Sequence, residues 1–422
     1  MNLDEISSYS YVIGASVIII ISYFFNIISK KWSIPSVLLL IVLGLIIRWT
    51  TGIHSIDGNS PLLGALGVVG LIMIVLEASL DLELKKEKMG MILKSFLIAI
   101  IALSISSYLI ALVLQWVFET NLFVALLYAI PLSIMSSAII IPSVDSLSPK
   151  KREFMIYESA FSDILGIMFF YFLLGSTEYE TANALTWSIL WNVLLTIFVS
   201  LLFSYTLIYV FQKIGSQTKL FLLIAVLILL YTIGKMMHLS SLIIILFFGL
   251  ILHNRTLFFR GNWRKVFDMV ELEKIYKEFK LITEESSFVV RTFFFVIFGI
   301  TISLSALFKW KVIFVSLVLL AVLYAVRWLV LVIFLRKNIM PELFIAPRGL
   351  ITILLFFAIP KTYILPNFEE GILFFIIITS SVIMAVTLIK NRRRKSLEEK
   401  QIAQEEEHQT NLTEEESSFT EI

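Results

Sequence analysis

The sequence predicts an all-α polytopic membrane protein with thirteen transmembrane helices, to within one. Hydrophobic residues make up 59% of the 422 residues and charged residues only 16%, whereas an average soluble domain carries about 25% charged residues. Apolar stretches close to the roughly 20 residues that a helix needs to cross a bilayer recur along the chain. Two of them are interrupted in corresponding places, which is typical of folds built from inverted repeats with broken helices.

The predicted spans follow directly from the apolar segments. They cover residues 10–28, 33–49, 62–80, 93–117, 121–145, 154–174, 184–211, 219–234, 239–252, 286–307, 311–335, 342–359 and 368–390. The eighth and ninth are short and can also be read as one kinked hairpin. We interpret residues 1–390 as the transmembrane domain, with repeats at 10–174 and 219–390 and a linker helix at 184–211.

The distribution of lysine and arginine predicts the orientation, because cytoplasmic loops carry the excess of basic residues. With the N-terminus outside an inner cell membrane and the C-terminus in the cytoplasm, the inner connections contain Lys30, Lys31, Lys85, Lys86, Lys88, Lys94, Lys150, Lys151, Arg152, Lys213, Lys219, the basic segment 255–280, Arg336, Lys337, Lys390 and residues 392–395. The outer connections contain only Arg48, Lys235, Lys309, Lys311 and Lys361.

Two segments are predicted to lie outside the bilayer. Residues 261–284 are charged and form either an amphipathic helix on the cytoplasmic surface or a plain connector helix. The apolar members of this segment are Trp263, Val266, Phe267, Val270, Ile275 and Phe279. Residues 391–422 begin basic and become acidic and polar, a composition typical of a disordered cytoplasmic tail.

The composition also argues against several classes of function. A net charge of +2 argues against nucleic acid as a partner. The chain has no cysteine, and its four histidines are not spaced as pairs of metal ligands, so neither a zinc nor a haem site is expected. We therefore expect no cofactor.

Asp163 is the most informative residue of the chain, because it lies inside the apolar span 154–174. An ionisable group at bilayer depth costs roughly 2.5–3.5 kcal/mol. The preceding span is interrupted from Ser136 and Ser137 to Pro142, and broken backbone in a membrane lines a cavity or packs in protein.

A buried carboxylate can bind either a monovalent cation or a proton, and so can couple the two. The hydroxyls of Ser136, Ser137 and Ser162, with carbonyls freed by the break, would complete an oxygen shell for the cation around Asp163. The alternative is that Asp163 only holds two helices together by hydrogen bonds.

Three further charges are expected to be buried. Glu158 lies about 140° around the helix from Asp163, so the two need not face one site. Arg348, at the second break after Pro347, is the predicted partner of Glu158; the alternative gives Glu158 a role in proton transport. Arg327 is predicted to neutralise helix ends or a carboxylate.

Together these residues resemble the monovalent cation:proton antiporter superfamily. Residues 157–163 (YESAFSD) are similar to the Glu-Ser-x-x-Asn-Asp stretch of sodium/proton exchangers, and residues 136–138 to the Ser-Ser-Thr break of the potassium-efflux branch. Residues 293–299 resemble the Phe-Phe-x-x-x-Gly run of a late core helix, and residues 347–349 the Arg-Gly break. Ser162 departs from the pattern, because exchangers have asparagine there and electrogenic members have aspartate.

The resemblance implies a homodimeric antiporter that exchanges a monovalent cation, sodium first and potassium or lithium as alternatives, for protons by alternating access. It also implies that Glu158 and Arg348 form the family's structural acid–arginine pair. Because no second acid adjoins Asp163 and the tenth span has no mid-helix lysine, we predict electroneutral exchange. Competing interpretations are a sodium-coupled organic-anion carrier of the same architecture, a membrane-embedded enzyme and a channel.

Overall fold

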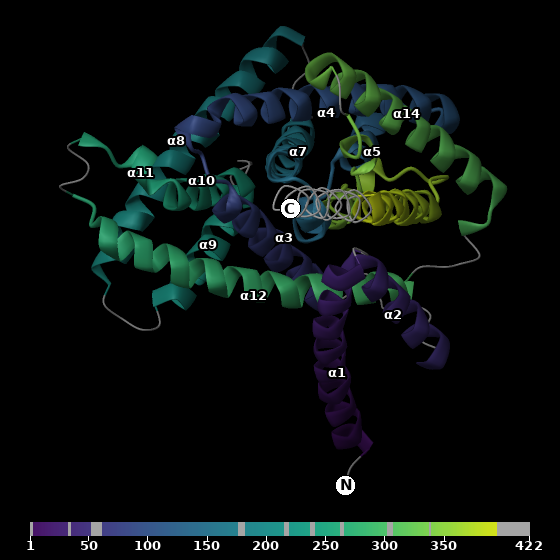
Figure 1. Ribbon diagram of the computed structural model, residues 1–422, viewed down its shortest axis with the longest axis horizontal. Coiled ribbons are helices and arrows are strands. Elements are labelled where there is room, and N and C mark those ends of the chain that lie inside the picture. Colours follow the sequence, from purple (N-terminus) through teal and green to yellow (C-terminus); the bar gives the residue numbers. More distant parts are fainter. Residues whose placement is uncertain are drawn as a thin grey trace, which may run out of the picture.

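The computed structural model describes residues 3–32, 35–51, 61–175, 182–214, 219–236, 241–261, 266–301, 307–336 and 339–394. These residues form helices joined by short connections and contain no strand (Figure 1). This confirms the predicted all-α class. Most of the predicted tail, from residue 395 onward, lies outside the described residues.

Most of the helices overlap the segments predicted from hydropathy. Their bounds are α1 Leu3–Trp32, α2 Ser36–Thr51, α3 Pro61–Asp81, α4 Met89–Phe118, α5 Leu122–Ser133, α6 Ser137–Ile140, α7 Pro149–Gly175, α8 Ala182–Lys213, α9 Lys219–Met236, α10 Ser241–His253, α11 Arg255–Phe258, α12 Met269–Thr301, α14 Trp310–Leu335, α15 Leu350–Phe357 and a last helix Glu370–Arg394. Among the described residues, seven helices are long and apolar enough to cross a membrane. The number of spans therefore stays a prediction.

The helices pack as two bundles (Figure 1). In the first, α4 packs against α5, α7 and α14, and α15 packs on α5 and α7. The last helix joins this bundle, since the Ser316 hydroxyl on α14 donates to the Ile372 carbonyl. In the second, α12 packs against α2 and α3, α1 against α2, and α10 against α3, α8 and α9. We call the first the site bundle, because it carries Asp163, and the second the scaffold bundle.

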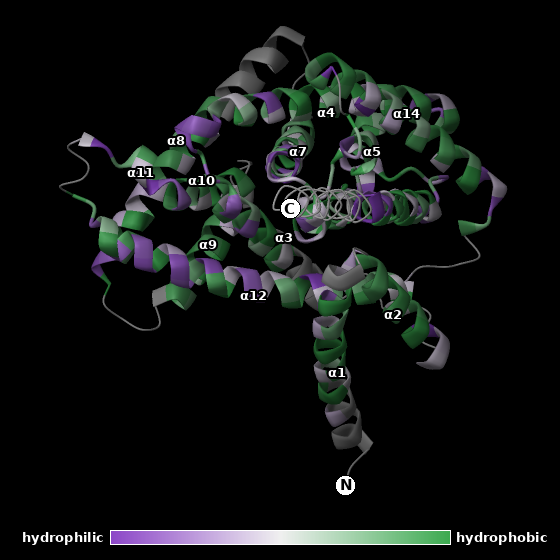
Figure 2. Cartoon of the chain, in the orientation of Figure 1, coloured by the Kyte–Doolittle hydropathy of each residue, from purple (hydrophilic) through white to green (hydrophobic). Residues whose placement is uncertain are grey.

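From Met269 on, the segment predicted to lie outside the bilayer continues without a break into the tenth predicted span. Residues 269–301 form one continuous helix, α12, whose first half is polar and whose second half is apolar (Figure 2). No glycine or proline occurs between Met269 and Phe298, so nothing in the backbone interrupts it. Ile275 and Phe279 are buried as expected, but Val266 and Val270 are exposed, and Trp263 lies outside the described residues.

Both predicted breaks are present. In the fifth span, helix α5 ends at Ser133, and the backbone is extended at residues 134–136. The chain becomes helical again with α6 and a 3₁₀ turn, Ile141–Ser146. The twelfth span begins with a 3₁₀ turn, Glu342–Phe344, passes through non-helical backbone at residues 345–349, and turns α-helical only at α15. Proline supplies part of the reason, because Pro347 lacks a backbone donor and disfavours helical backbone in the residue before it.

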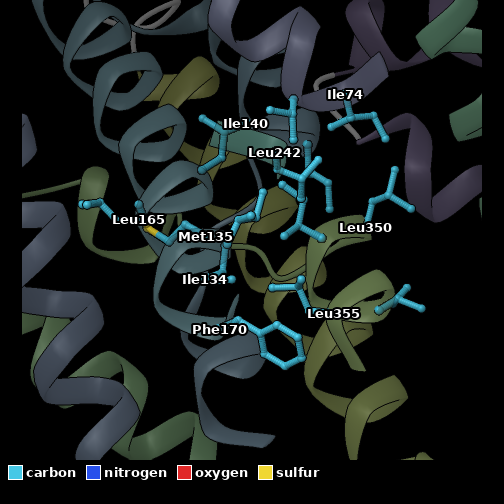
Figure 3. Packing of buried hydrophobic residues seen from close by; sticks show 14 of the residues in the cluster. Ile74, Ile134, Met135, Ile140, Leu165, Phe170, Leu242, Leu350 and Leu355 are labelled. Atoms are coloured by element: carbon cyan, nitrogen blue, oxygen red, sulfur yellow. The ribbon is translucent and has the colours of Figure 1, made fainter. Parts of the chain in front are cut away.

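Apolar side chains pack closely around these interruptions. Figure 3 shows contributions from α3, the first break, α6, α7, α10 and α15. The labelled members are Ile74, Ile134, Met135, Ile140, Leu165, Phe170, Leu242, Leu350 and Leu355. The polar backbone of the breaks therefore lies in an apolar surrounding, where its groups need partners inside the protein.

Candidate functional site

The two broken spans touch each other at their breaks. The Ser136 amide donates to the Pro347 carbonyl at 2.9 Å. Gly349 lies so close to the first break that a Cβ placed on it would come within 2.6 Å of the Ser136 hydroxyl and 2.9 Å of the Ser136 Cβ. The contact thus requires a residue without a side chain at position 349.

Arg348 strengthens this contact and lies in the interior, with 4% of it exposed. Its Nε donates to the Leu132 carbonyl at 2.9 Å, its Nη1 to the Ala346 carbonyl at 2.6 Å, and its amide to the Ser380 hydroxyl at 3.0 Å. Leu132 belongs to the last turn of α5, where the unpaired carbonyls carry partial negative charge. Arg348 therefore neutralises the end of the first half-helix.

Helix α7 brings Asp163 to the first break. The Asp163 side chain accepts a hydrogen bond from the Ser137 amide at 3.0 Å through Oδ2, and the Ser137 hydroxyl lies beside the carboxyl group. Its second oxygen, Oδ1, is buried and has no hydrogen-bond partner among the described residues. Only 2% of Asp163 is exposed.

Close packing of α7 on the break makes this placement possible. Gly166, one turn after Asp163, faces Ile134, and a Cβ at that position would overlap the Ile134 side chain. Ser162 fixes the neighbouring backbone, because the Met135 amide donates to its hydroxyl at 2.9 Å. The Ser136 hydroxyl is buried and without a hydrogen-bond partner in the described part of the chain.

Glu158 does not pair with Arg348; its partner is Arg327. The two nitrogens Nη1 and Nη2 of Arg327 donate to Oε1 and Oε2 of Glu158 at 2.7 and 3.1 Å. Glu158 is 0% and Arg327 5% exposed. This is the two-pronged geometry in which guanidinium and carboxylate bind most strongly, so the predicted pair Glu158–Arg348 is corrected to Glu158–Arg327.

Arg327 also binds the backbone that leads into the second break. Its Nε donates to the carbonyls of Glu342 and Leu343, both at 3.1 Å, and its Nη2 to the Glu342 carbonyl at 2.8 Å. The Glu342 carboxylate in turn pairs with Lys151 at 2.8 Å. Arg327 thus joins α14, α7 and the second break into one unit and neutralises the Glu158 charge.

Sequence reasoning gave no role to Thr352, two residues inside α15. Its hydroxyl is buried and lacks a hydrogen-bond partner within the described residues. A threonine in the first turn after Gly349 was the available signal. Ser136 and Thr352 are thus two buried hydroxyls near the breaks that have no hydrogen-bond partner among the described residues.

A carboxylate with one unused oxygen, beside two half-helices that meet in an apolar interior, defines a class of protein. This is the architecture of a secondary transporter that carries small ions. The model of the family described as "Sodium/hydrogen exchanger, transmembrane" matches residues 16–390. The chain therefore belongs to the sodium/hydrogen exchanger family, and it is a multi-pass membrane antiporter of cations and protons.

Solved structures share its fold. One is the sodium proton antiporter MjNhaP1 from Methanocaldococcus jannaschii at pH 8, with a TM-score of 0.68 and 20% identity over 93% of this chain and 100% of that chain. An electron-microscopy map of the same antiporter gives a TM-score of 0.66 and 19% identity, over 94% and 97% of the two chains. No curated protein matches the chain.

Proposed function

We propose that this protein exchanges Na⁺, with K⁺ and Li⁺ as the alternative cations, for H⁺, and that Asp163 is the shared carrier. The supporting observation is the unused Asp163 Oδ1, buried beside the first break. A proton and a cation compete for one carboxylate, so a single group couples their movements. Ser136, Ser137 and Ser162 would supply neighbouring oxygens to the cation.

The exchange proceeds by alternating access, with the site bundle moving against the scaffold bundle. Support comes from the packing, because Asp163, both breaks and the Glu158–Arg327 pair all lie in the site bundle. Strong polar contacts inside this bundle favour its movement as one body. In the working arrangement two copies associate as a homodimer through their scaffold bundles.

The N-terminus lies outside an inner cell membrane and the C-terminus in the cytoplasm. Ion pairs support this orientation, because they join connections that were predicted to share one side. Lys88 pairs with Glu153 at 2.6 Å and Lys280 with Asp81 at 2.7 Å, all four on the predicted inner side. Lys309 pairs with Glu369 at 2.7 Å on the predicted outer side. We call the predicted inner side, which carries Lys88 and Lys280, the basic face.

Proton flux in proteoliposomes with Na⁺, K⁺ and Li⁺ supplied in turn tests the proposal. The purified protein should move protons against at least one cation gradient, and Asp163→Asn should abolish this movement. Asp145→Asn is the matched control, since Asp145 is an exposed aspartate of the same bundle, paired with Arg152. Wild-type exchange by a folded Asp163→Asn protein would contradict the assignment.

A further inference from the structure

Helix α7 is fastened to the scaffold bundle on both sides of Asp163, each time by a phenol. Toward the basic face, the Tyr157 hydroxyl donates to the Glu83 carbonyl at 2.6 Å. Toward the opposite face, the hydroxyl of Tyr171 lies beside the hydroxyl of Tyr231 of α9. At 1.5 Å per residue, Tyr157 lies roughly 9 Å and Tyr171 roughly 12 Å from Asp163 along the helix axis.

The carbonyl that Tyr157 binds is fixed to the scaffold bundle. Asn254, after α10, donates to the Leu82 carbonyl at 2.8 Å and accepts from the Leu84 amide at 2.5 Å. Two contacts from α12 hold the residues just before: Tyr276 donates to the Leu80 carbonyl at 3.3 Å, and Lys280 pairs with Asp81 at 2.7 Å. Residues 80–84 therefore stay with the scaffold bundle, and the Tyr157 hydrogen bond crosses the boundary between the bundles.

A small apolar cluster fills this boundary on the basic-face side of Asp163. It is separate from the main hydrophobic core and consists of Leu82, Ile92, Tyr157 and Ala160, with Leu84, Phe161 and Leu250 packed against it. Ala160 and Tyr157 precede Asp163 by one and by nearly two helical turns. The cluster thus stands between Asp163 and the basic face along α7.

The other boundary is closed in the same way. Tyr231 is buried in the main core, and Ile167, one turn beyond Asp163 toward Tyr171, is 3% exposed. With both contacts formed, Asp163 is enclosed from the two directions along its own helix.

We propose that Tyr157 and Tyr171 are two latches, one on each side of the membrane, that hold the closed state and open in turn during transport. This rests on the proposed alternating access. Since α7 carries Asp163, a movement that exposes Asp163 to the basic face must break the Tyr157 contact with Glu83, and exposure to the other face must break the Tyr171 contact with Tyr231. Both tyrosines act as positioning residues, because they fix α7 and do not touch the cation.

Cysteine accessibility tests the two latches separately, because the chain has no cysteine of its own. Ala160→Cys reports on the basic-face side and Ile167→Cys on the opposite side. A membrane-impermeant methanethiosulfonate is added to vesicles of either orientation. Adding Tyr157→Phe should speed labelling of the Ala160→Cys protein from the basic face about fivefold, as expected for losing one net hydrogen bond, and leave labelling of the Ile167→Cys protein unchanged. Adding Tyr171→Phe should speed labelling of the Ile167→Cys protein from the opposite face and leave labelling of the Ala160→Cys protein unchanged.

Tyr128→Phe is the matched control. The Tyr128 hydroxyl accepts from the Leu365 amide at 2.9 Å within the site bundle, so its loss should lower the melting temperature without changing either labelling rate. Asn254→Ala and Tyr231→Phe provide second variants for the two latches. Unchanged labelling in all four latch variants, or equal acceleration from both sides, would overturn the proposal. Labelling does not depend on cation flux, so this result is separable from failure of the proposed exchange.

Discussion

Glu158 and Asp163 are two buried carboxylates on one helix, and the structure treats them in opposite ways. Glu158 is 0% exposed and has both oxygens bound by Arg327. Asp163 is 2% exposed, and only one of its oxygens has a hydrogen-bond partner among the described residues. No arginine, lysine or histidine forms an ion pair with Asp163 in the described part of the chain.

The difference supports the proposal that Glu158 is a structural acid and that Asp163 is the carrier. An acid with both oxygens bound by a guanidinium has no oxygen left to bind a cation. An acid held by one amide keeps its position and retains an oxygen for exchangeable partners. Burial alone therefore does not distinguish the two acids, and the unsatisfied oxygen is what favours Asp163 as the proposed carrier.

The largest expected effect concerns the stability of the Glu158 site. Removing one partner of a buried ion pair costs about 3–5 kcal/mol, so Glu158→Ala and Arg327→Ala should each lower the melting temperature in detergent strongly. The double variant should lose much less than the sum of the two. The control is Glu158→Ala combined with Arg348→Ala, in which the two losses of melting temperature should be close to additive. Strong coupling between Glu158 and Arg348, together with additivity between Glu158 and Arg327, would restore the pairing expected from the sequence.

A smaller effect is expected at the crossing next to Asp163. Gly349→Ala places a methyl group 2.6 Å from the Ser136 hydroxyl and 2.8 Å from the Ile139 Cδ1, and overpacking of this kind costs about 1–3 kcal/mol. Exchange should fall and the apparent affinity for the cation should weaken. Ser136→Gly in the same chain relieves the overlap and should restore part of the stability. A Gly349→Ala protein with wild-type affinity and melting temperature would show that the close approach is not required.

The sequence was sufficient to predict where the two helices break, but not which side chains pair with each other. Pro347, Gly349 and the serines at 136 and 137 mark the breaks through local backbone chemistry, which a sequence shows directly. The choice between Arg327 and Arg348 depends on how α14 is rotated against α7, and residue spacing gives depth along a helix without that rotation. The latch partners of Tyr157 and Tyr171 are hidden for the same reason.

The continuity of α12 shows another limit. Charged residues such as Lys280 and Glu284 suggested a boundary between a surface helix and a span. Charges change the surroundings of a helix without ending it, and only glycine, proline or a cap does that. The absence of glycine and proline between Met269 and Gly299 was the better guide to where the helix begins and ends.

A still smaller effect on stability distinguishes Asp163 from Glu158. Asp163→Asn keeps the shape of the side chain and an oxygen that can accept from the Ser137 amide. It removes the charge of a carboxylate whose Oδ1 has no hydrogen-bond partner among the described residues. The melting temperature should stay the same or rise, as is common where function keeps a costly group. Glu158→Gln, the matched substitution on the same helix, should lower it. A large loss of stability in Asp163→Asn alone would mean that Asp163 mainly holds the bundle together.

The smallest expected effect is that of membrane potential on the exchange rate. Asp163 has Ser162 as its neighbour, Glu158 is bound by Arg327, and residues 293–301 of α12 contain no lysine. One carboxylate that alternates between one proton and one monovalent cation moves no net charge in a full cycle. Proteoliposomes that exchange Na⁺ for H⁺ should therefore keep the same rate when a potassium-diffusion potential of either sign is imposed, with K⁺ first excluded as a substrate. A rate that changes several-fold with the potential would require a second titrating group, and Glu158→Gln would then show whether Glu158 is that group.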